Sequence, residues 1–575
     1  MKGKLFKLIN KYRGILLFFY FLLLTCVFTR PLCLGIANEN VGGYGDNLYF
    51  IWQIGWIKQA VFDYGELPYR THLLNFPYGY NLATTEIAPL QLLIGFPAAV
   101  GGNPVLGYNL SILATFILAG LTMYYWVYQM TKSWQASLLS STAFAFLPYH
   151  QAHFLTGHLN ISAIQWFPLF FMGFFEILTD KDFSWKNVVV LTAGLAGIAL
   201  SSQYYLYMSF FTGLCILILF FVFRKGKQAA NWQVWKQFLI AFGMSLPFFV
   251  IGILPYFLLH RGGGSSRPLA DVMVFSASIT DFLLPFTKSI IAGGWVSRNF
   301  PRALWNEGTL YIGIPVLFLS IYAVIQQEKH EKRKDLVWLM AAGAVLAMIL
   351  AMGTHLTWKE EPLLIQTPGF LANLVEEESF YILMPGYYLF RYFPFYDIMR
   401  AWMRYGIIAL TLFCAAAGVG ASYLLNLIKK PWKNIAATIL ITLVIIDFLP
   451  TQFRTVEIKP REVDEWLAEQ PHGGQVQMPL IQSYEESSIY YTLTNRKPLI
   501  GVIRTFPSPR YFQLEPHLRG FPDVESGRAL REEQITYVVV DEAEYIIDEA
   551  FIDAAEQSGL DYAVSIDGQS VFIIR

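Results

Sequence analysis

The chain has 575 residues, of which 55% are hydrophobic and 15% are charged, whereas about 25% of the residues in an ordinary soluble domain are charged. The net charge of zero hides an asymmetry: residues 455–575 carry 10 basic and 21 acidic side chains, and the rest of the chain carries 32 and 21. Apolar runs long enough to cross a bilayer recur from Gly14 to Pro450. They predict a polytopic helical membrane protein and exclude a β-barrel, whose strands would be short and alternating.

The N-terminus predicts a signal-anchor rather than a cleaved signal peptide. Residues 1–13 contain five basic side chains, and the apolar run Gly14–Leu34 that follows lacks a small-x-small cleavage site. Because basic residues flank membrane spans on the cytoplasmic side, we expect the N-terminus to be cytoplasmic.

A long outer loop, residues 35–105, follows the first span. Asp46 comes directly after the glycine-rich stretch Gly42–Gly45, and Asp46–Gln53 is typical of an amphipathic, aromatic-rich helix on the bilayer surface. Asp46 is therefore a catalytic candidate, and capping of this helix is the alternative. The apolar run Ile87–Val100 is short and contains two prolines. We interpret it as a re-entrant or surface segment, because as a span it would invert the topology of every later element.

Eleven spans are predicted in all, and most have the 17–25 residues that suit the hydrocarbon thickness. Their short inside connectors hold 19 of the 32 basic residues that precede the tail, as the positive-inside rule expects. An odd number of spans places the C-terminal tail outside the cell. The predicted spans are 14–34, 106–130, 134–152, 158–178, 187–202, 204–223, 237–259, 308–327, 335–353, 404–427 and 434–450.

Polar residues that could perform chemistry gather on the predicted outer side, whereas the spans are nearly free of charge. An ion-coupled transporter usually keeps ionisable groups near the midplane, so this distribution counts against transport. The candidates are Asp46 and Glu86 in the first loop; His150, His153 and His158 between spans three and four; Tyr204 and Tyr205 at span six; Asp281, Arg298, Arg302 and Glu307 in loop 260–307; and Arg391, Arg400 and Arg404 before span ten.

The histidines and the last three arginines each have two readings. His150 and His153 are three residues apart, so on a helix they could share a face and bind a metal; ordinary interfacial residues are the alternative. Three arginines within 14 residues favour an anionic ligand such as a phosphate. Snorkelling to lipid headgroups is the alternative for arginines near span ends, and for Arg391 alone it is the favoured one.

Residues 455–575 predict a small α/β domain. We find neither a nucleotide-binding glycine loop nor a nucleophile elbow there, so a structural or acceptor-binding role is expected. The predicted elements are a helix at Pro460–Gln470, strands at Gln475–Ile481 and Tyr537–Asp541, helices at Ser526–Glu533 and Glu544–Ser558, and a hairpin of Tyr562–Ile566 and Ser570–Ile574 about Asp567-Gly568.

The layout of residues 1–450 resembles the GT-C superfamily of integral-membrane glycosyltransferases, and in motif the resemblance rests on Gly45-Asp46 and its flanks. It implies that Asp46, an aspartate of the first outer loop, is the catalytic base, that the donor is a sugar on a polyprenyl phosphate, and that a soluble domain follows the spans. Here one acidic residue stands in place of an Asp-x-Asp pair, and the tail contains no sequon-reading motif.

The chain is also similar to bacterial membrane proteins that carry Gly-His-Leu-Asn before a Gln-Trp-x-Pro span. These motifs are Gly157–Asn160 and Gln165–Pro168 in this sequence, and an Arg-x-x-x-Arg segment, here Arg400 to Arg404, precedes a late span.

The predicted fold class is therefore an all-α polytopic membrane protein of about 11 helices, GT-C-like over residues 1–454, with a small extracytoplasmic α/β domain over residues 455–575. We expect an inverting glycosyltransferase at the outer face of a bacterial plasma membrane. It would move a sugar from a polyprenyl-phosphate-linked donor to a glycan, lipid or protein acceptor of the cell envelope. The lipid bilayer is a further partner, and nucleic acid is not. The sequence identifies no cofactor with certainty, and a divalent metal is left open.

Each candidate residue then has an expected role. Asp46 is the general base. The donor phosphate is bound by Arg391, Arg400, Arg404 and His158. The supporting residues are Glu86, His150, His153, Tyr204, Tyr205, Arg298, Arg302 and Glu307.

Two other functions remain open at this point. A flippase or transporter for lipid-linked glycans predicts a charged or water-filled cavity between the spans. A non-catalytic scaffold for envelope polymer assembly predicts that Asp46 can be replaced without loss of function.

Overall fold

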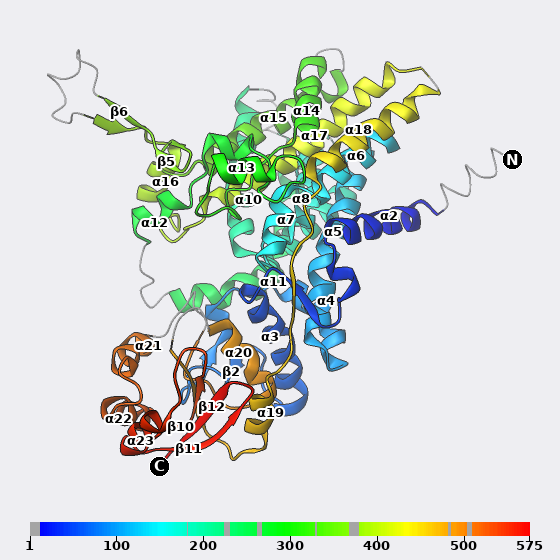
Figure 1. The fold of residues 1–575 in the computed structure, drawn as a ribbon. Coiled ribbons are helices and arrows are strands. Elements are labelled where there is room, and N and C mark those ends of the chain that lie inside the picture. The colour runs from blue at the N-terminus through cyan, green and yellow to red at the C-terminus, as the bar shows by residue number, and fades with distance from the viewer. Residues whose placement is uncertain are drawn as a thin grey trace. The chain divides into compact units, whose positions relative to one another are not determined.

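The computed structural model describes residues 12–180, 182–223, 231–260, 267–327, 331–366, 379–429, 431–480, 485–502 and 509–575. The chain is mostly helical and divides into two compact units (Figure 1). The first unit contains residues 1–33, 112–155 and 160–453. The second contains residues 34–111, 156–159 and 454–575, so it combines the predicted first outer loop with the acidic tail.

Four helices within the described residues are long and apolar enough to cross a membrane. They coincide with four of the predicted spans, so the chain is a membrane protein. The total of eleven spans stays a prediction. The four are α5 (Pro104–Thr131), α10 (Gln203–Phe223), Trp232–Ile253 of α11 (Trp232–His260), and Trp402–Asn426, in which a 3₁₀ turn leads into α17 (Gly406–Asn426).

Shorter helices account for most of the other predicted spans. The first unit also holds small elements in the loops that were predicted to lie outside. The longer ones are α2 (Arg13–Phe28), α6 (Trp134–Ala145), α7 (Pro148–Leu155), α8 (Phe167–Thr179), α9 (Trp185–Ala199), α14 (Ile314–Gln326), α15 (Glu331–Ala351) and α18 (Trp432–Phe448). The smaller ones are α12 (Leu269–Val274), α13 (Gly293–Asn299), α16 (Pro385–Tyr392), β4 (Thr357–Trp358), β5 (Glu361–Pro362), β6 (Leu364–Gln366) and β7 (Ser379–Tyr381).

Helix α17 lies inside the first unit, where it packs against α14, α15 and α6. Its apolar window is 89% buried, against 22% for that of α11. Small residues make this packing close: a Cβ on Gly418 would meet Val127 Cγ1 at 2.6 Å, and one on Gly420 would overlap the Leu319 carbonyl. Without a hydrophobic driving force between helices in lipid, such small-residue contacts are what hold spans together.

The charge pattern behind the predicted orientation falls largely outside the described residues. These exclude residues 1–11, Lys181, residues 224–227, Lys329 and Lys430. The cytoplasmic N-terminus and the outer position of the tail therefore stay predictions.

A four-stranded sheet forms the core of the tail's part of the second unit. Its order is β11-β12-β10-β9, with β9 parallel to β10 and the other pairs antiparallel. Tyr537 and Val539 face one apolar cluster, and Val538 and Val540 face another, so β10 is buried on both faces and reads as a continuous apolar run. The strands are β9 (Gly474–Met478), β10 (Ile535–Asp541), β11 (Leu560–Ile566) and β12 (Gln569–Ile574).

Helices pack around this sheet. They are α19 (Glu462–Glu469), α20 (Glu485–Asn495), α21 (Pro509–Leu514), α22 (Val524–Glu532) and α23 (Glu549–Gln557). The predicted hairpin about Asp567-Gly568 is present between β11 and β12. Both turn residues have positive φ, 51° and 72°, as a two-residue hairpin turn requires.

The first-loop residues and the tail residues form one structure rather than two. Strand β1 (Glu39–Val41) pairs antiparallel with β8 (Thr455–Glu457). Leu74 of the first loop and Gln475 of β9 each form a parallel bridge with Leu499. The other first-loop elements are α3 (Asp46–Lys58), a π-helical turn at Gln59–Tyr64, β2 (Arg70–Thr71), β3 (Tyr80–Asn81) and α4 (Pro89–Val100). Whether residues 455–575 would fold as a domain on their own stays a prediction.

Helix α3 is present where a surface helix was predicted, but its setting differs. Residues Asn47–Trp56 are all buried, and the helix packs against α20 and α4 (Figure 1). The expectation of a one-sided helix on the bilayer surface is wrong, because the partner helix α20 lies more than 400 residues away in sequence and leaves no local signal.

Candidate functional site

Asp46 and His158 meet within the second unit. Asp46 is the first residue of α3, and its Oδ2 lies 3.2 Å from Nε2 of His158. The Asp46 side chain is 49% exposed and that of His158 is 15% exposed. A carboxylate that is half open to solvent and held by an imidazole on one side has the access and the partner that proton transfer needs.

Gly157 brings His158 to this place. Its φ is +79°, and a Cβ there would lie 2.6 Å from the backbone nitrogen of Asn47. Only glycine combines this left-handed conformation with so close an approach. The Gly-His pair of the sequence motif therefore has a physical meaning: the glycine lets the connector approach the start of α3, and the histidine reaches Asp46.

Asn47, which the sequence reasoning missed, holds the loop before α3. Its Oδ1 accepts from the backbone N–H groups of Gly45 and Leu48, each at 2.9 Å, and its Nδ2 donates to the Gly43 carbonyl at 2.7 Å. The helix N-cap is Gly45. The side-chain bonds at this turn thus belong to Asn47, in keeping with the preference of asparagine for such turns, and Asp46 is not the N-cap.

Glu86 is tied to α3 through its backbone. Its carbonyl accepts from Gln53 Nε2 at 3.1 Å, and Tyr49 of the same helix bonds the neighbouring Thr85 side chain. Burial raises the pKa of Tyr49 far above its usual range, so the tyrosine stays neutral.

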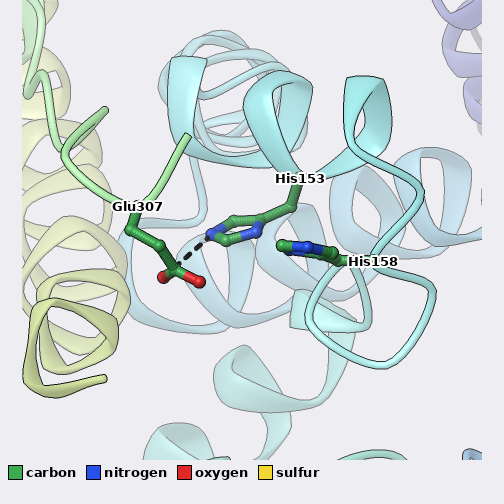
Figure 2. Close-up of side chains that lie close together, drawn as sticks. All are labelled: His153, His158 and Glu307. Carbon is green, nitrogen blue, oxygen red and sulfur yellow. Dashed lines mark ion pairs between the residues drawn. The ribbon is translucent and has the colours of Figure 1, made fainter. Parts of the chain in front are cut away.

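A second carboxylate cluster lies inside the first unit. Arg404 donates to Glu307 three times, from Nε to both carboxylate oxygens at 3.2 Å and from Nη2 to Oε1 at 2.7 Å. Figure 2 shows the ring of His153 facing Glu307, with Nε2 3.9 Å from Oε2. The side chains of Arg404 and Glu307 are only 8% and 3% exposed, so the two charges compensate each other away from water.

The tyrosines predicted as supporting residues have different neighbours. The Arg404 guanidinium lies 4.8 Å from the centre of the Tyr204 ring, a cation–π contact. Tyr205 instead bonds the hydroxyl of Tyr149 at 2.9 Å and donates to the Ile161 carbonyl at 2.6 Å. Tyr204 therefore belongs to the arginine cluster, and Tyr205 belongs to the packing of the helices.

His150 is not placed to bind a metal with His153. Its Nε2 lies 2.9 Å from Thr115 Oγ1, its Nδ1 lies 2.9 Å from the Ala145 carbonyl, and its ring stacks on Phe116. Both ring nitrogens are thus engaged, and a metal ligand needs one of them. The charge of the Glu307 carboxylate is balanced by Arg404, which donates to both of its oxygens.

The three arginines before α17 do not form one set. Arg404 is buried, Arg400 is half-buried with its guanidinium 4.4 Å from the centre of the Phe275 ring, and Arg391 is exposed on α16. The 3₁₀ turn begins only at Trp402. Arg400 and Arg404 therefore do not lie on one continuous helix, and their guanidinium groups have separate partners.

The loop 260–307 contains another buried pair. Nη2 of Arg302 lies 3.2 Å from Oδ1 of Asp281, whose Oδ2 accepts from the Ser278 backbone at 2.8 Å. Burial raises the pKa of Asp281 to about 6, although Arg302 and the Ser278 bond act in the opposite direction. Arg298 is exposed, and its Nε donates to the Gly294 carbonyl of its own helix at 3.1 Å.

Residues 56–419 match the family described as "Domain of unknown function (DUF6311)". A sequence comparison with curated proteins gives no match.

Among solved structures, the chain is similar to the arabinofuranosyltransferase AftD from Mycobacteria, with a TM-score of 0.55 and 11% identity over 98% of this chain and 41% of that one. The chain thus spans less than half of that protein. It is also similar to ArnT from Cupriavidus metallidurans bound to undecaprenyl phosphate, with a TM-score of 0.47 and 10% identity over 98% of both chains. The archaeal oligosaccharyltransferase AglB from Archaeoglobus fulgidus, in complex with an inhibitory peptide and a dolichol-phosphate, has a TM-score of 0.42 and 12% identity over 99% of this chain and 75% of that one. The predicted GT-C-like fold is confirmed.

Proposed function

This chain belongs to the family described as "Domain of unknown function (DUF6311)", and we propose that it is an inverting membrane glycosyltransferase with Asp46 as general base. The donor is a sugar on a polyprenyl phosphate, and the acceptor is a hydroxyl of a cell-envelope glycan, lipid or protein. The reaction takes place at the outer face of a bacterial plasma membrane, with the N-terminus cytoplasmic and the α/β tail, residues 455–575, outside.

One observation carries the proposal: the half-exposed carboxylate of Asp46 beside His158 on a GT-C-like fold. A general base must be open to the substrate whose proton it takes, and it must be held in place. The other carboxylates that the sequence singled out in the first unit, Glu307 and Asp281, are buried against arginines. The Asp46 side chain alone among these three combines exposure with an imidazole partner.

The proposed reaction balances without a metal. Asp46 takes the proton of the acceptor hydroxyl while the acceptor oxygen forms a bond to the anomeric carbon of the donor. The bond from that carbon to the phosphate oxygen breaks, and the electron pair leaves with the lipid phosphate. Attack from the face opposite the phosphate inverts the anomeric centre. A positioned base contributes about 10²–10⁴-fold to such a rate.

The phosphate needs a cationic partner as its charge develops. In the proposal, arginines of the segment Arg391–Arg404 bind it. Arg400 is the better candidate within this segment, because the charge of Arg404 is already balanced by Glu307. A lipid-linked donor also gives a reason for the protein to be embedded in the membrane, since the prenyl chain has to stay in an apolar phase.

The test is transfer of a radiolabelled sugar from a polyprenyl-phosphate donor by the purified protein. Asp46→Asn keeps the size of the side chain and removes the proton acceptor, so we expect the transfer rate to fall about 10²–10⁴-fold. Asp63→Asn is the matched control: this carboxylate lies in the same loop but is paired with Lys58 at 2.8 Å, and we expect wild-type activity. If Asp46→Asn retains most of its activity, the proposal fails.

A further inference from the structure

We infer that the C-terminal segment is a working part of the proposed catalytic unit: helix α20 clamps helix α3 and so fixes the position of Asp46. The inference rests on the proposed function for the role of Asp46, whereas the clamp itself is testable without any enzyme assay. It gives the tail a role that differs from binding an acceptor or a wall polymer as a separate domain.

The clamp has a polar contact at its centre. Nε1 of Trp52 donates to Oγ1 of Thr492 at 2.9 Å, and the threonine hydroxyl donates in turn to the Ile489 carbonyl at 2.7 Å. Both Trp52 and Thr492 are fully buried. A buried indole N–H without an acceptor is costly, so this bond fixes which residues of α3 and α20 face each other.

One helical turn further along α3, a side chain of α20 packs directly against the backbone of α3. A Cβ on Gly55 would lie 2.6 Å from Leu493 Cδ1, and Gln59 Nε2 donates to the Leu493 carbonyl at 2.8 Å. The glycine thus makes room for a leucine of α20, and the glutamine ties the end of α3 to the same residue. Two successive turns of α3 are held by two neighbouring positions of α20.

An apolar cluster surrounds these contacts. Trp52 and Trp56 are parallel, with ring centres 6.0 Å apart, and Tyr49 stacks on Trp52 at 6.2 Å. Ile489 and Leu499 from the tail pack with them in one cluster. Large aromatic side chains contribute much of the burial energy of a core. The tail residues Ile489 and Leu499 therefore form part of the core that buries α3.

Asp46 is the first residue of this clamped helix. At 1.5 Å per residue, it lies about 9 Å along the helix axis from Trp52. A helix transmits a shift or tilt at one turn to the next, and a displacement of about 1 Å at a reacting group costs on the order of 10²-fold in rate. Thr492 is therefore a positioning residue, which acts on Asp46 through α3 without touching the substrate.

The experiment compares three variants of the full-length protein in detergent micelles. Thr492→Val keeps the shape and removes the hydroxyl, Thr492→Ser keeps the hydroxyl, and Thr494→Val makes the same change at a half-buried position of α20. Hydrogen exchange followed by mass spectrometry reports the protection of α3, and sugar transfer reports the site.

We expect Thr492→Val to lower the protection of α3 amides about tenfold, with the hairpin β11–β12 unchanged, as loss of the acceptor of a buried donor implies. Its kcat should fall with KM unchanged, because the displaced group acts in the transition state. Thr492→Ser should restore both readouts, and Thr494→Val should leave both at wild-type level.

Three other results would contradict the clamp, the positioning of Asp46 or the proposed function. Unchanged protection of α3 in Thr492→Val overturns the clamp. Lower protection with wild-type kcat shows that the clamp does not position Asp46, and overturns the inference while leaving the proposed function intact. Lower protection in a protein whose transfer activity is also insensitive to Asp46→Asn means that the proposed function has failed, and with it the positioning role, while the clamp stands as a structural contact only.

Discussion

The two units hold carboxylates of the same kind in opposite settings. In the first unit, Glu307 accepts three hydrogen bonds from Arg404, and both side chains are less than a tenth exposed. In the second unit, Asp46 meets His158 at 3.2 Å with about half of its side chain open. A buried pair is closed to substrate and matters for folding, whereas a half-open pair is available for chemistry and contributes little to stability.

The residue type of a charged side chain near a span does not by itself reveal the role of that side chain. Arg404 and Asp46 were both functional candidates in the sequence, yet Arg404 is buried with a charged partner, whereas Asp46 is half exposed beside an imidazole. We therefore expect replacements in the first unit to change mainly stability and replacements in the second unit to change mainly activity.

The largest effect on stability is expected from Arg404→Ala. It leaves Glu307 as an uncompensated buried charge, which typically costs about 3–5 kcal/mol. Thermal unfolding in detergent measures the loss, and Arg400→Ala is the matched control, since its cation–π contact with Phe275 is worth only about 0.5–1 kcal/mol. Equal losses in the two variants would show that the burial of the Arg404–Glu307 pair has no energetic consequence, and the contrast between the units would collapse.

Asp281, a second buried carboxylate of the first unit, should make the stability of the fold depend on pH. The pKa of Asp281 is raised to about 6 in the folded chain, against about 3.9 when unfolded. Because the folded pKa is the higher one, this group stabilises the fold below about pH 4, and the contribution is lost as the pH rises towards 6. At 1.36 kcal/mol per unit the loss is on the order of 3 kcal/mol.

The measurement is the free energy of unfolding between pH 4 and 7 for the wild type and Asp281→Asn. Asparagine cannot ionise, so the decline over this range should be smaller in the variant. Parallel profiles for the two proteins would mean that Arg302 keeps Asp281 ionised throughout and that burial does not dominate.

In the second unit, Gly157→Ala should have an intermediate effect. The added Cβ meets the backbone of Asn47 at a positive φ, and strain of this kind costs about 1–3 kcal/mol. The connector has to shift, so His158 moves from Asp46 and transfer activity falls as well. Gly43→Ala is the control, because its Cβ position is open and changes there stay within about 0.5 kcal/mol. Equal activity in both variants would separate His158 from the function of Asp46.

The smallest effect is expected from Arg391→Ala. This side chain is exposed on α16, so the free energy of unfolding should change by less than about 0.5 kcal/mol, and binding of a polyprenyl-phosphate analogue should change less than in Arg400→Ala. A binding titration in nanodiscs measures the second quantity. A larger loss of binding in Arg391→Ala than in Arg400→Ala would reverse our assignment of the phosphate-binding residue.

The sequence predicted what depends on local pattern. Apolar runs marked the four long helices, and Asp567-Gly568 marked a hairpin turn whose positive φ angles only such residues adopt readily. The Gly-Asp pattern after the first span is just as local, and the role of Asp46 that it indicates stays a prediction. In each case the signal lies within a few residues of the feature that it predicts.

What the sequence could not reveal depends on partners far along the chain. His158 lies 112 positions from Asp46, and Glu307 lies 97 positions from Arg404. Thr492 lies 440 positions from Trp52. Its helix, α20, packs against α3, which the local sequence alone predicted to be a surface helix. No periodicity in a local window contains these pairings, and they decide which polar residues are closed and which are open.

The most direct test of the central claim is a structure of the full-length protein in nanodiscs with polyprenyl phosphate. We expect the phosphate to lie beside the Asp46 carboxylate, with space between them for one sugar ring. A phosphate bound with its closest protein groups far from Asp46, so that no sugar ring could bridge the two, would contradict the assignment of Asp46 as the base.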